Sequence, residues 1–355
     1  MLARLRGRYK LGCIPGTPPD CGAGGGQPDE PVGSWEYSGS DLEKCHISPA
    51  AAATPHMDRV EAAMRKVAPD LEGIAYQRTH NNKFVGYNGR RDSWLLQTPD
   101  CWGQAACRNP IGIRRFLRTL QADLARARRQ VDATGMIPFP SGKMRQAIVR
   151  GLRRGYRMGN RPTIRVLGGC DPPCAMAPGS PSVQDYADQL SADIGGKPRI
   201  VVASHRYAPV GTPANLPALS WNHSKTIAVD GRVALVGGHN LWSPDYIQGY
   251  PQKQVRNPVH DVTIRVEGPA AIAVHKWANT LWGRACAAAR TTPPGAANGA
   301  NIGYAPGTPR ACPASIRPPR PRGTGRVDVL GFGRLALLGV KAPNGPATGR
   351  GGPDD

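Results

Sequence analysis

The chain has no long apolar run. Its 355 residues contain no uninterrupted stretch of the roughly 18 apolar residues with which a helix crosses a bilayer. The first 45 residues also lack the short apolar segment of a secretory signal peptide, although they begin with basic residues. The sequence therefore predicts neither a membrane-spanning helix nor a readable signal peptide.

Acidic residues are scarce. The chain has 25 Asp and Glu against 46 Lys and Arg, which gives a formal net charge of +21. A surface of this kind favours phosphates, either in nucleic acid or in anionic lipid headgroups, and the charge alone does not choose between them. An arginine bias can also reflect nothing more than GC-rich coding.

Cysteine is plentiful for a cytosolic protein, since the chain has nine. Two close pairs, Cys101 with Cys107 and Cys170 with Cys174, could each close a small loop, which favours an oxidising compartment. The spacing of the second pair is not that of a zinc site, and no Cys or His pair follows at zinc-finger spacing. We therefore expect no metal and no cofactor.

Composition divides the chain into three regions. Residues 1–53 and 287–355 are rich in glycine and proline and lack apolar periodicity, so we expect a poorly ordered N-terminal segment and a low-complexity tail. Only residues 54–286 have the patterns of a folded catalytic lobe.

Within that lobe, apolar residues at helical spacing predict helices, and short β-branched runs predict strands. The alternation predicts an α/β sandwich, a mixed β-sheet flanked by helices, in a single lobe. The predicted helices lie around Ile113–Leu124, Met144–Leu152 and Ala270–Trp282, and the predicted strands are Thr163–Leu167, Arg199–Ala203, Lys225–Val229, Arg232–Val236 and Val262–Val266.

One cluster of polar residues stands out: His223-x-Lys225-x4-Asp230, followed by Gly237, Gly238 and Asn240. Period-two alternation along a strand would place the side chains of Trp221, His223 and Lys225 on one face.

Asp230-Gly231 predicts a two-residue hairpin turn that pairs Val229 with Arg232. Counting back from this turn sets Lys225 opposite Val236, His223 opposite Gly238, and Trp221 opposite Asn240.

These residue types suit phosphoryl transfer. An imidazole can attack phosphorus, Lys225 can neutralise the charge on the non-bridging oxygens, and the Asn240 amide can add a hydrogen bond. Gly238 beside His223 would leave space for a phosphate, and we expect Gly237, Gly238 and Trp221 to bind the substrate. Asp230 completes the catalytic motif, although its type also fits a simple turn former. The sequence near the motif has no cluster of carboxylates that would bind a metal.

The motif resembles that of the phospholipase D superfamily, and five further segments resemble secreted phospholipases D of the streptomycete type. The resemblance implies that His223 forms a phosphohistidine and that Asp261 orients its imidazole. It also implies a disulfide between Cys101 and Cys107. His239 departs from the family, which usually has an apolar residue there, and we expect it to face away from the site. The segments are Thr54–Asp58, Trp94–Gly103, Ile137–Pro140, Ser220–Lys225 and Val266–Trp282.

A second histidine motif, which the superfamily uses to protonate the departing alcohol, is absent from the sequence. Two explanations stay open: the chain is the N-terminal half of a two-lobed enzyme, or two copies of His223 meet in a homodimer.

The resemblance implies a secreted phosphodiesterase that hydrolyses glycerophospholipids such as phosphatidylcholine at a membrane surface. The alternatives are a homodimeric endonuclease, for which the positive charge argues, and an inactive protein that binds phosphate or lipid.

Overall fold

The computed structural model describes residues 55–86, 94–99, 111–136, 139–169, 181–207, 220–246, 259–291, 299–318 and 323–333. All statements about structure below refer to these ranges.

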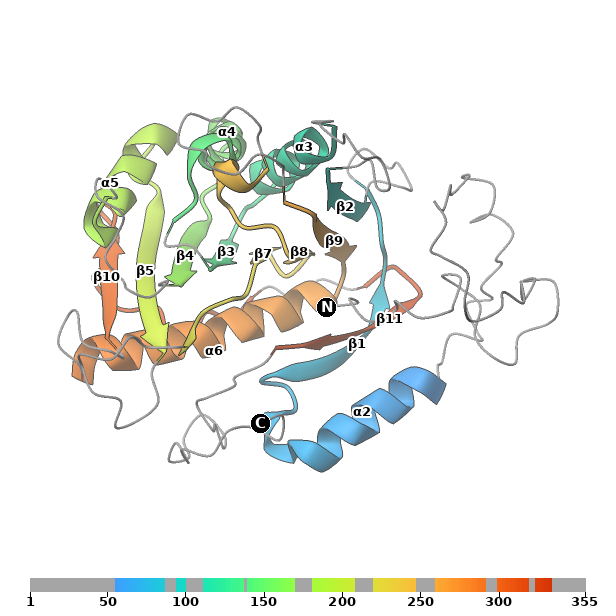
Figure 1. The fold of residues 1–355 in the computed structure, drawn as a ribbon. Coiled ribbons are helices and arrows are strands. Elements are labelled where there is room, and N and C mark those ends of the chain that lie inside the picture. Colours follow the sequence, from blue (N-terminus) through green and yellow to red (C-terminus); the bar gives the residue numbers. More distant parts are fainter. Residues whose placement is uncertain are drawn as a thin grey trace.

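A mixed nine-stranded sheet forms the centre of the molecule (Figure 1). Its strands follow the order β10-β5-β4-β3-β7-β8-β9-β2, and β6 pairs with β5 beside this path. The pairs β3–β4 and β4–β5 are parallel, whereas the other pairs are antiparallel. The strands are β2 (Leu95–Thr98), β3 (Gln130–Gly135), β4 (Thr163–Gly169), β5 (Arg199–Tyr207), β6 (Ser220–Trp221), β7 (Thr226–Val229), β8 (Val233–Gly237), β9 (Asp261–Glu267) and β10 (Ala300–Tyr304).

Helices cover both faces of the sheet, as Figure 1 shows. One face carries α3, α4 and α5, which pack on residues such as Val131, Ile164 and Ile200. The other face carries α6, whose Leu281 and Trp282 are buried in a second cluster. This arrangement confirms the predicted mixed sheet flanked by helices. The helices are α2 (Pro55–Val67), α3 (Ile111–Ala125), α4 (Gly142–Arg157), α5 (Val183–Ile194) and α6 (Ala270–Thr291), with short 3-10 turns η1 (Pro69–Leu71) and η4 (Ser243–Asp245).

The predicted elements of the lobe are present. The helical patterns around Ile113, Met144 and Ala270 correspond to α3, α4 and α6, and the five predicted strands correspond to β4, β5, β7, β8 and β9. None of the described helices is both long enough and apolar enough to span a membrane.

Two arginines lie fully buried in ion pairs. Arg165 on β4 donates two hydrogen bonds to Asp132 on β3, and the ring of His275 on α6 contacts the same carboxylate. Arg265 on β9 forms a second two-bond pair with Asp123 on α3. Removing one partner of such a pair leaves a buried charge uncompensated, at a cost of about 3–5 kcal/mol.

The expected boundary at residue 286 is wrong. Cys286 on α6 forms a disulfide with Cys312, and β10 pairs with β5 at the edge of the large sheet. Further along, β11 (Val327–Phe332) pairs with β1 (Tyr76–Asn82) in a separate two-stranded sheet beside α2. The sequence did not reveal β10 and β11, because their surroundings are rich in glycine and proline. Each of these strands is stabilised by pairing with its partner strand rather than by an apolar alternation of its own.

Candidate active site

The histidine of the motif lies between two strands rather than on one. β6 ends at Trp221 and β7 begins at Thr226, so the expected continuous strand is wrong. Asn222 causes the break, because its side-chain oxygen accepts hydrogen bonds from the backbone N–H (3.1 Å) and hydroxyl (2.5 Å) of Ser224. Such an Asx turn competes with strand pairing. It leaves His223 exposed and Asn222 buried.

His223 and Lys225 nevertheless lie on the same side, as the motif predicted. The Lys225 ammonium donates to His223 Nδ1 at 3.0 Å and to the His223 carbonyl at 2.9 Å. Partial burial lowers the pKa of His223 below its ordinary value, and the neighbouring Lys225 lowers it further. Burial also lowers the pKa of Lys225 to about 8. The site therefore holds a neutral imidazole beside a cation at neutral pH.

The two glycines permit a close approach of β9. A Cβ atom on Gly237 would lie 2.2 Å from the Val262 carbonyl oxygen, and one on Gly238 would lie 2.1 Å from Asp261 Oδ1. The expected space for a phosphate beside Gly238 is thus filled by the Asp261 carboxylate. The structure gives the glycines a packing role that brings this acid to the site.

Tyr246 connects the acid to the loop that follows the glycines. Its hydroxyl donates to Asp261 Oδ2 at 2.7 Å and accepts from the Asn240 backbone N–H at 2.7 Å. The Asn240 side-chain amide donates to Asp245 Oδ2 at 3.0 Å. One turn, η4 with Tyr246, thereby fixes both Asn240 and Asp261, which sequence reasoning had treated separately.

Burial raises the pKa of Asp261, while the Tyr246 hydrogen bond and the charge of Lys225 oppose that rise. The same carboxylate raises the pKa of His223 through space. The structure shows no hydrogen bond between these two side chains, because His223 Nδ1 contacts Lys225 instead. The orienting role of Asp261 stays a prediction.

The last residue of the motif lies at the far end of β7. The Asp230 carboxylate accepts hydrogen bonds from the backbone N–H groups of Arg128, Arg129 and Gln130, each at 2.8 Å. The structure does not bring Asp230 to His223. Its contacts anchor the β7–β8 turn to the start of β3.

The predicted hairpin turn is present, but the register beyond it is wrong by one residue. Asp230 and Gly231 both have positive φ, and Arg232 N–H donates to the Val229 carbonyl at 2.9 Å. Val229 then pairs with Val233 instead of Arg232. Arg232 is an extra residue whose carbonyl accepts from Gly268 N–H, and the slip sets Lys225 beside Gly237.

His239 faces away from the site, as expected. It is buried, its ring stacks on Phe116 with 4.6 Å between centroids, and its two ring nitrogens contact the hydroxyls of Thr98 and Thr263. Burial lowers its pKa to about 3. It is a neutral packing residue.

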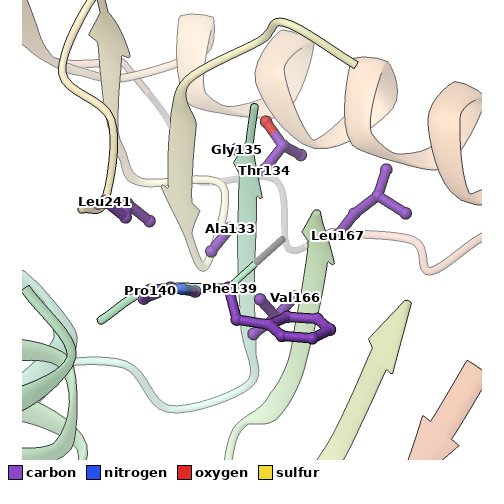
Figure 2. Close-up of a pocket in the computed structure, with 8 residues that line it drawn as sticks. All are labelled: Ala133, Thr134, Gly135, Phe139, Pro140, Val166, Leu167 and Leu241. Atoms are coloured by element: carbon purple, nitrogen blue, oxygen red, sulfur yellow. The ribbon is translucent and has the colours of Figure 1, made fainter. Parts of the chain in front are cut away.

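A small apolar pocket lies beside the motif, at the carboxyl ends of β3 and β4 (Figure 2). The Thr134 hydroxyl in its wall hydrogen-bonds to the hydroxyl of Ser224, the residue between His223 and Lys225 (2.8 Å). The pocket is lined by Ala133, Thr134, Gly135, Phe139, Pro140, Val166, Leu167 and Leu241.

Among the residues that the structure describes, no group of three or more His, Cys, Asp or Glu could hold a metal ion. The cysteines Cys101, Cys107, Cys170 and Cys174 lie outside the described residues, as does the Trp221 side chain. The sequence did not single out the Cys286–Cys312 disulfide, because its two cysteines are 26 residues apart.

Comparison with known proteins found a clear relative. The chain is 34% identical over 306 residues to a phospholipase D from Streptomyces antibioticus; the match covers 83% of the chain and 50% of that enzyme. The chain thus spans about half the length of this relative. No protein-family model matches the chain.

Among solved structures, NucT from Helicobacter pylori covers 57% of the chain and 93% of its own length, with 11% identity and a TM-score of 0.35. The phospholipase D family member Nuc from Salmonella typhimurium covers 51% of the chain and 85% of its own length, with 13% identity and a TM-score of 0.28.

The mixed sheet and the contact between His223 and Lys225 define an α/β protein with a histidine–lysine site. The chain belongs to the phospholipase D superfamily.

Proposed function

We propose that the chain acts as a phospholipase D-type phosphodiesterase on glycerophospholipids such as phosphatidylcholine. The observation that carries the proposal is the 3.0 Å contact between a neutral, exposed His223 and the Lys225 ammonium, next to the Asp261 carboxylate. The similarity to the Streptomyces phospholipase D supports the lipid substrate.

His223 attacks phosphorus through Nε2, which must therefore carry a lone pair. In the structure Nδ1 accepts from Lys225, so the neutral ring holds its proton on Nε2. A phosphodiester resolves this conflict, because its non-bridging oxygens compete for the ammonium. Once Lys225 binds the phosphate, Nδ1 can take the proton and face Asp261, which stabilises the positive ring.

The attack forms a bond between Nε2 and phosphorus and breaks the bond to the headgroup alcohol, which leaves with a proton. Water then attacks the phosphohistidine and gives phosphatidate. The proton donor for the alcohol has to be a second acid. A second copy of this chain could supply it as another His223, so we include a homodimer in the proposal.

We also propose that the protein works in an oxidising compartment outside the cytoplasm. The Cys286–Cys312 disulfide supports this placement, because such bonds persist mainly in secreted proteins.

The test is release of choline from phosphatidylcholine vesicles by the full chain, with ethanol present to trap the covalent intermediate as phosphatidylethanol. We expect both products from the wild type and neither from His223→Ala. The mass of the active species is measured by analytical ultracentrifugation on the same sample.

Hydrolysis without any phosphatidylethanol would contradict the covalent intermediate. Cleavage of duplex DNA together with no lipid turnover would support the endonuclease instead. An active monomer would exclude the shared two-copy site.

A further inference from the structure

Two neighbouring helices, α3 and α4, carry a set of exposed arginines without acidic partners among the described residues. Arg114 and Arg118 on α3 and Arg150, Arg154 and Arg157 on α4 are all exposed. Within the described part of the chain, none of these five side chains forms an ion pair. We name this set the α3–α4 basic face.

The five arginines form one surface because the two helices pack closely. A Cβ atom on Gly151 would lie 2.7 Å from the Gln121 carbonyl oxygen, and one on Gly155 would lie 2.9 Å from the Ala125 carbonyl oxygen. Each helix presents its arginines at spacings of three or four residues, which places them in one row. The contacts at Gly151 and Gly155 set α3 and α4 parallel, so the arginines of α3 lie toward the starts of the two helices and those of α4 toward their ends.

Acidic side chains do not compensate this charge locally. α4 contains no acidic residue, and the only one on α3, Asp123, is buried and paired with Arg265. Asp193, at the end of α5, pairs with Arg145, which lies outside the face. The basic face therefore keeps its full positive potential and attracts phosphate-bearing surfaces.

Apolar side chains beside the face favour a lipid partner over nucleic acid. Ile111, at the start of α3, and Met158, at the end of α4, are 47% and 56% exposed. Trp242, which is 38% exposed, lies next to the start of α4. Such side chains can enter the headgroup and acyl boundary of a bilayer, whereas the phosphates of a duplex offer them no apolar contact.

We propose that the α3–α4 basic face docks the protein onto an anionic phospholipid bilayer, an interaction that rests on the proposed lipid substrate. The start of α4 is tied to the site loop, because Ser141 N–H donates to the Leu241 carbonyl and Met144 N–H donates to the Ser243 hydroxyl. The loop that carries Asn240 therefore adjoins the end of the face at which α4 begins.

The test measures binding of the full chain carrying His223→Ala, which removes turnover, to vesicles of phosphatidylcholine with and without phosphatidylglycerol. A face variant changes all five arginines to Gln. A matched control variant removes five charges elsewhere, on α2, on α6 and after β10: Arg59, Lys66, Arg290, Arg310 and Arg326, all exposed.

We expect binding that requires phosphatidylglycerol, weakens with salt, and falls roughly hundredfold or more in the face variant, since each basic residue near an anionic surface contributes about 1 kcal/mol. The control variant should lose much less. Circular dichroism and the thermal midpoint show whether both variants fold.

Equal losses in the two variants would overturn the proposal, because net charge alone would then explain binding. Binding of a DNA duplex through these arginines, with no vesicle binding, would also overturn it. Choline release by the chain with an intact His223 is measured separately. If this chain releases no choline, the proposed function is wrong. The vesicle-binding experiment still tests the docking role of the α3–α4 basic face independently of that result.

Discussion

The Tyr246 hydroxyl donates a 2.7 Å hydrogen bond to the Asp261 carboxylate. The same oxygen accepts from the backbone of Asn240, so one phenol connects the acid on β9 with the loop after the two glycines. A substitution of Tyr246 therefore tests the role of Asp261 in the proposed chemistry while His223 stays unchanged.

Tyr246→Phe should lower activity and shift the acidic limb of the pH–rate profile to higher pH. The hydrogen bond from Tyr246 lowers the pKa of Asp261, so its loss lets burial raise that pKa further. If ionised Asp261 supports the imidazole, the pH at which the rate falls in acid should rise. The measurement is a pH profile of choline release. Tyr76→Phe is the control, because it removes a buried hydroxyl with no described partner. A Tyr246→Phe profile that overlays the wild type would exclude the positioning role.

Activity should fall on the alkaline side as pH rises through about 8, the pKa of Lys225. Above that pH the lysine loses the charge that neutralises the phosphate oxygens. Lys225→Arg keeps its charge throughout this range, so any activity it retains should show no decline near pH 8. A wild-type rate that stays constant from pH 7 to 10 would contradict this reasoning.

Asp230→Ala should damage stability more than chemistry. Its carboxylate accepts three backbone hydrogen bonds at the end of β7 remote from His223, and hydrogen bonds to charged groups contribute about 1.5–3 kcal/mol each. We expect a loss of roughly 2–4 kcal/mol in the free energy of unfolding, since the three bonds are not additive. Urea unfolding measures this loss. We expect a choline release rate per folded molecule near that of the wild type. A loss of activity as complete as that of His223→Ala would instead show that Asp230 is a catalytic residue.

Gly238→Ala should displace Asp261, because the added methyl group would lie 2.1 Å from its Oδ1 atom. Overpacking of this kind costs about 1–3 kcal/mol. The free energy of unfolding and the choline release rate should both fall. Gly283→Ala on α6 is the matched control: nothing lies within 4 Å of its added methyl group, and alanine favours a helix by about 1 kcal/mol. If the two variants have the same stability and the same choline release rate, β9 shifts without cost to accommodate the methyl group and the prediction is wrong.

Removing the disulfide should loosen the segment after α6. A cross-link between Cys286 and Cys312 spans 26 residues, and a loop of that size contributes roughly 3 kcal/mol. Differential scanning calorimetry of Cys286→Ala with Cys312→Ala should show a lower thermal midpoint, and reductant should lower the wild-type midpoint by more than that of the double variant. If reductant leaves the wild type unchanged, the bond does not stabilise the fold.

The sequence was sufficient to predict the central fold. Apolar periodicity located α3, α4 and the strands around the motif, because burial on a sheet face or helix stripe imposes that periodicity directly. It was insufficient for β3, whose Asp132 breaks the apolar pattern. That carboxylate is buried only because Arg165 and His275, far away in sequence, compensate it.

The site was predictable in its residue types and less so in its geometry. His223 and Lys225 come together as the motif predicted, but by way of an Asx turn at Asn222 that alternation does not reveal. The one-residue slip after Arg232 depends on a contact with Gly268, remote in sequence. The sequence could not predict the role of the Tyr246 hydroxyl, since that role depends on the two partners that the fold brings to it.

The pairing of β1 with β11 governs how the protein can fold during synthesis. Tyr76 pairs with Phe332, so β1 is made early and its partner strand emerges some 250 residues later. Until then an unpaired strand edge is open to other chains. We expect nascent chains to depend on chaperones over this interval, and yield to improve when translation is slowed or the temperature of expression is lowered.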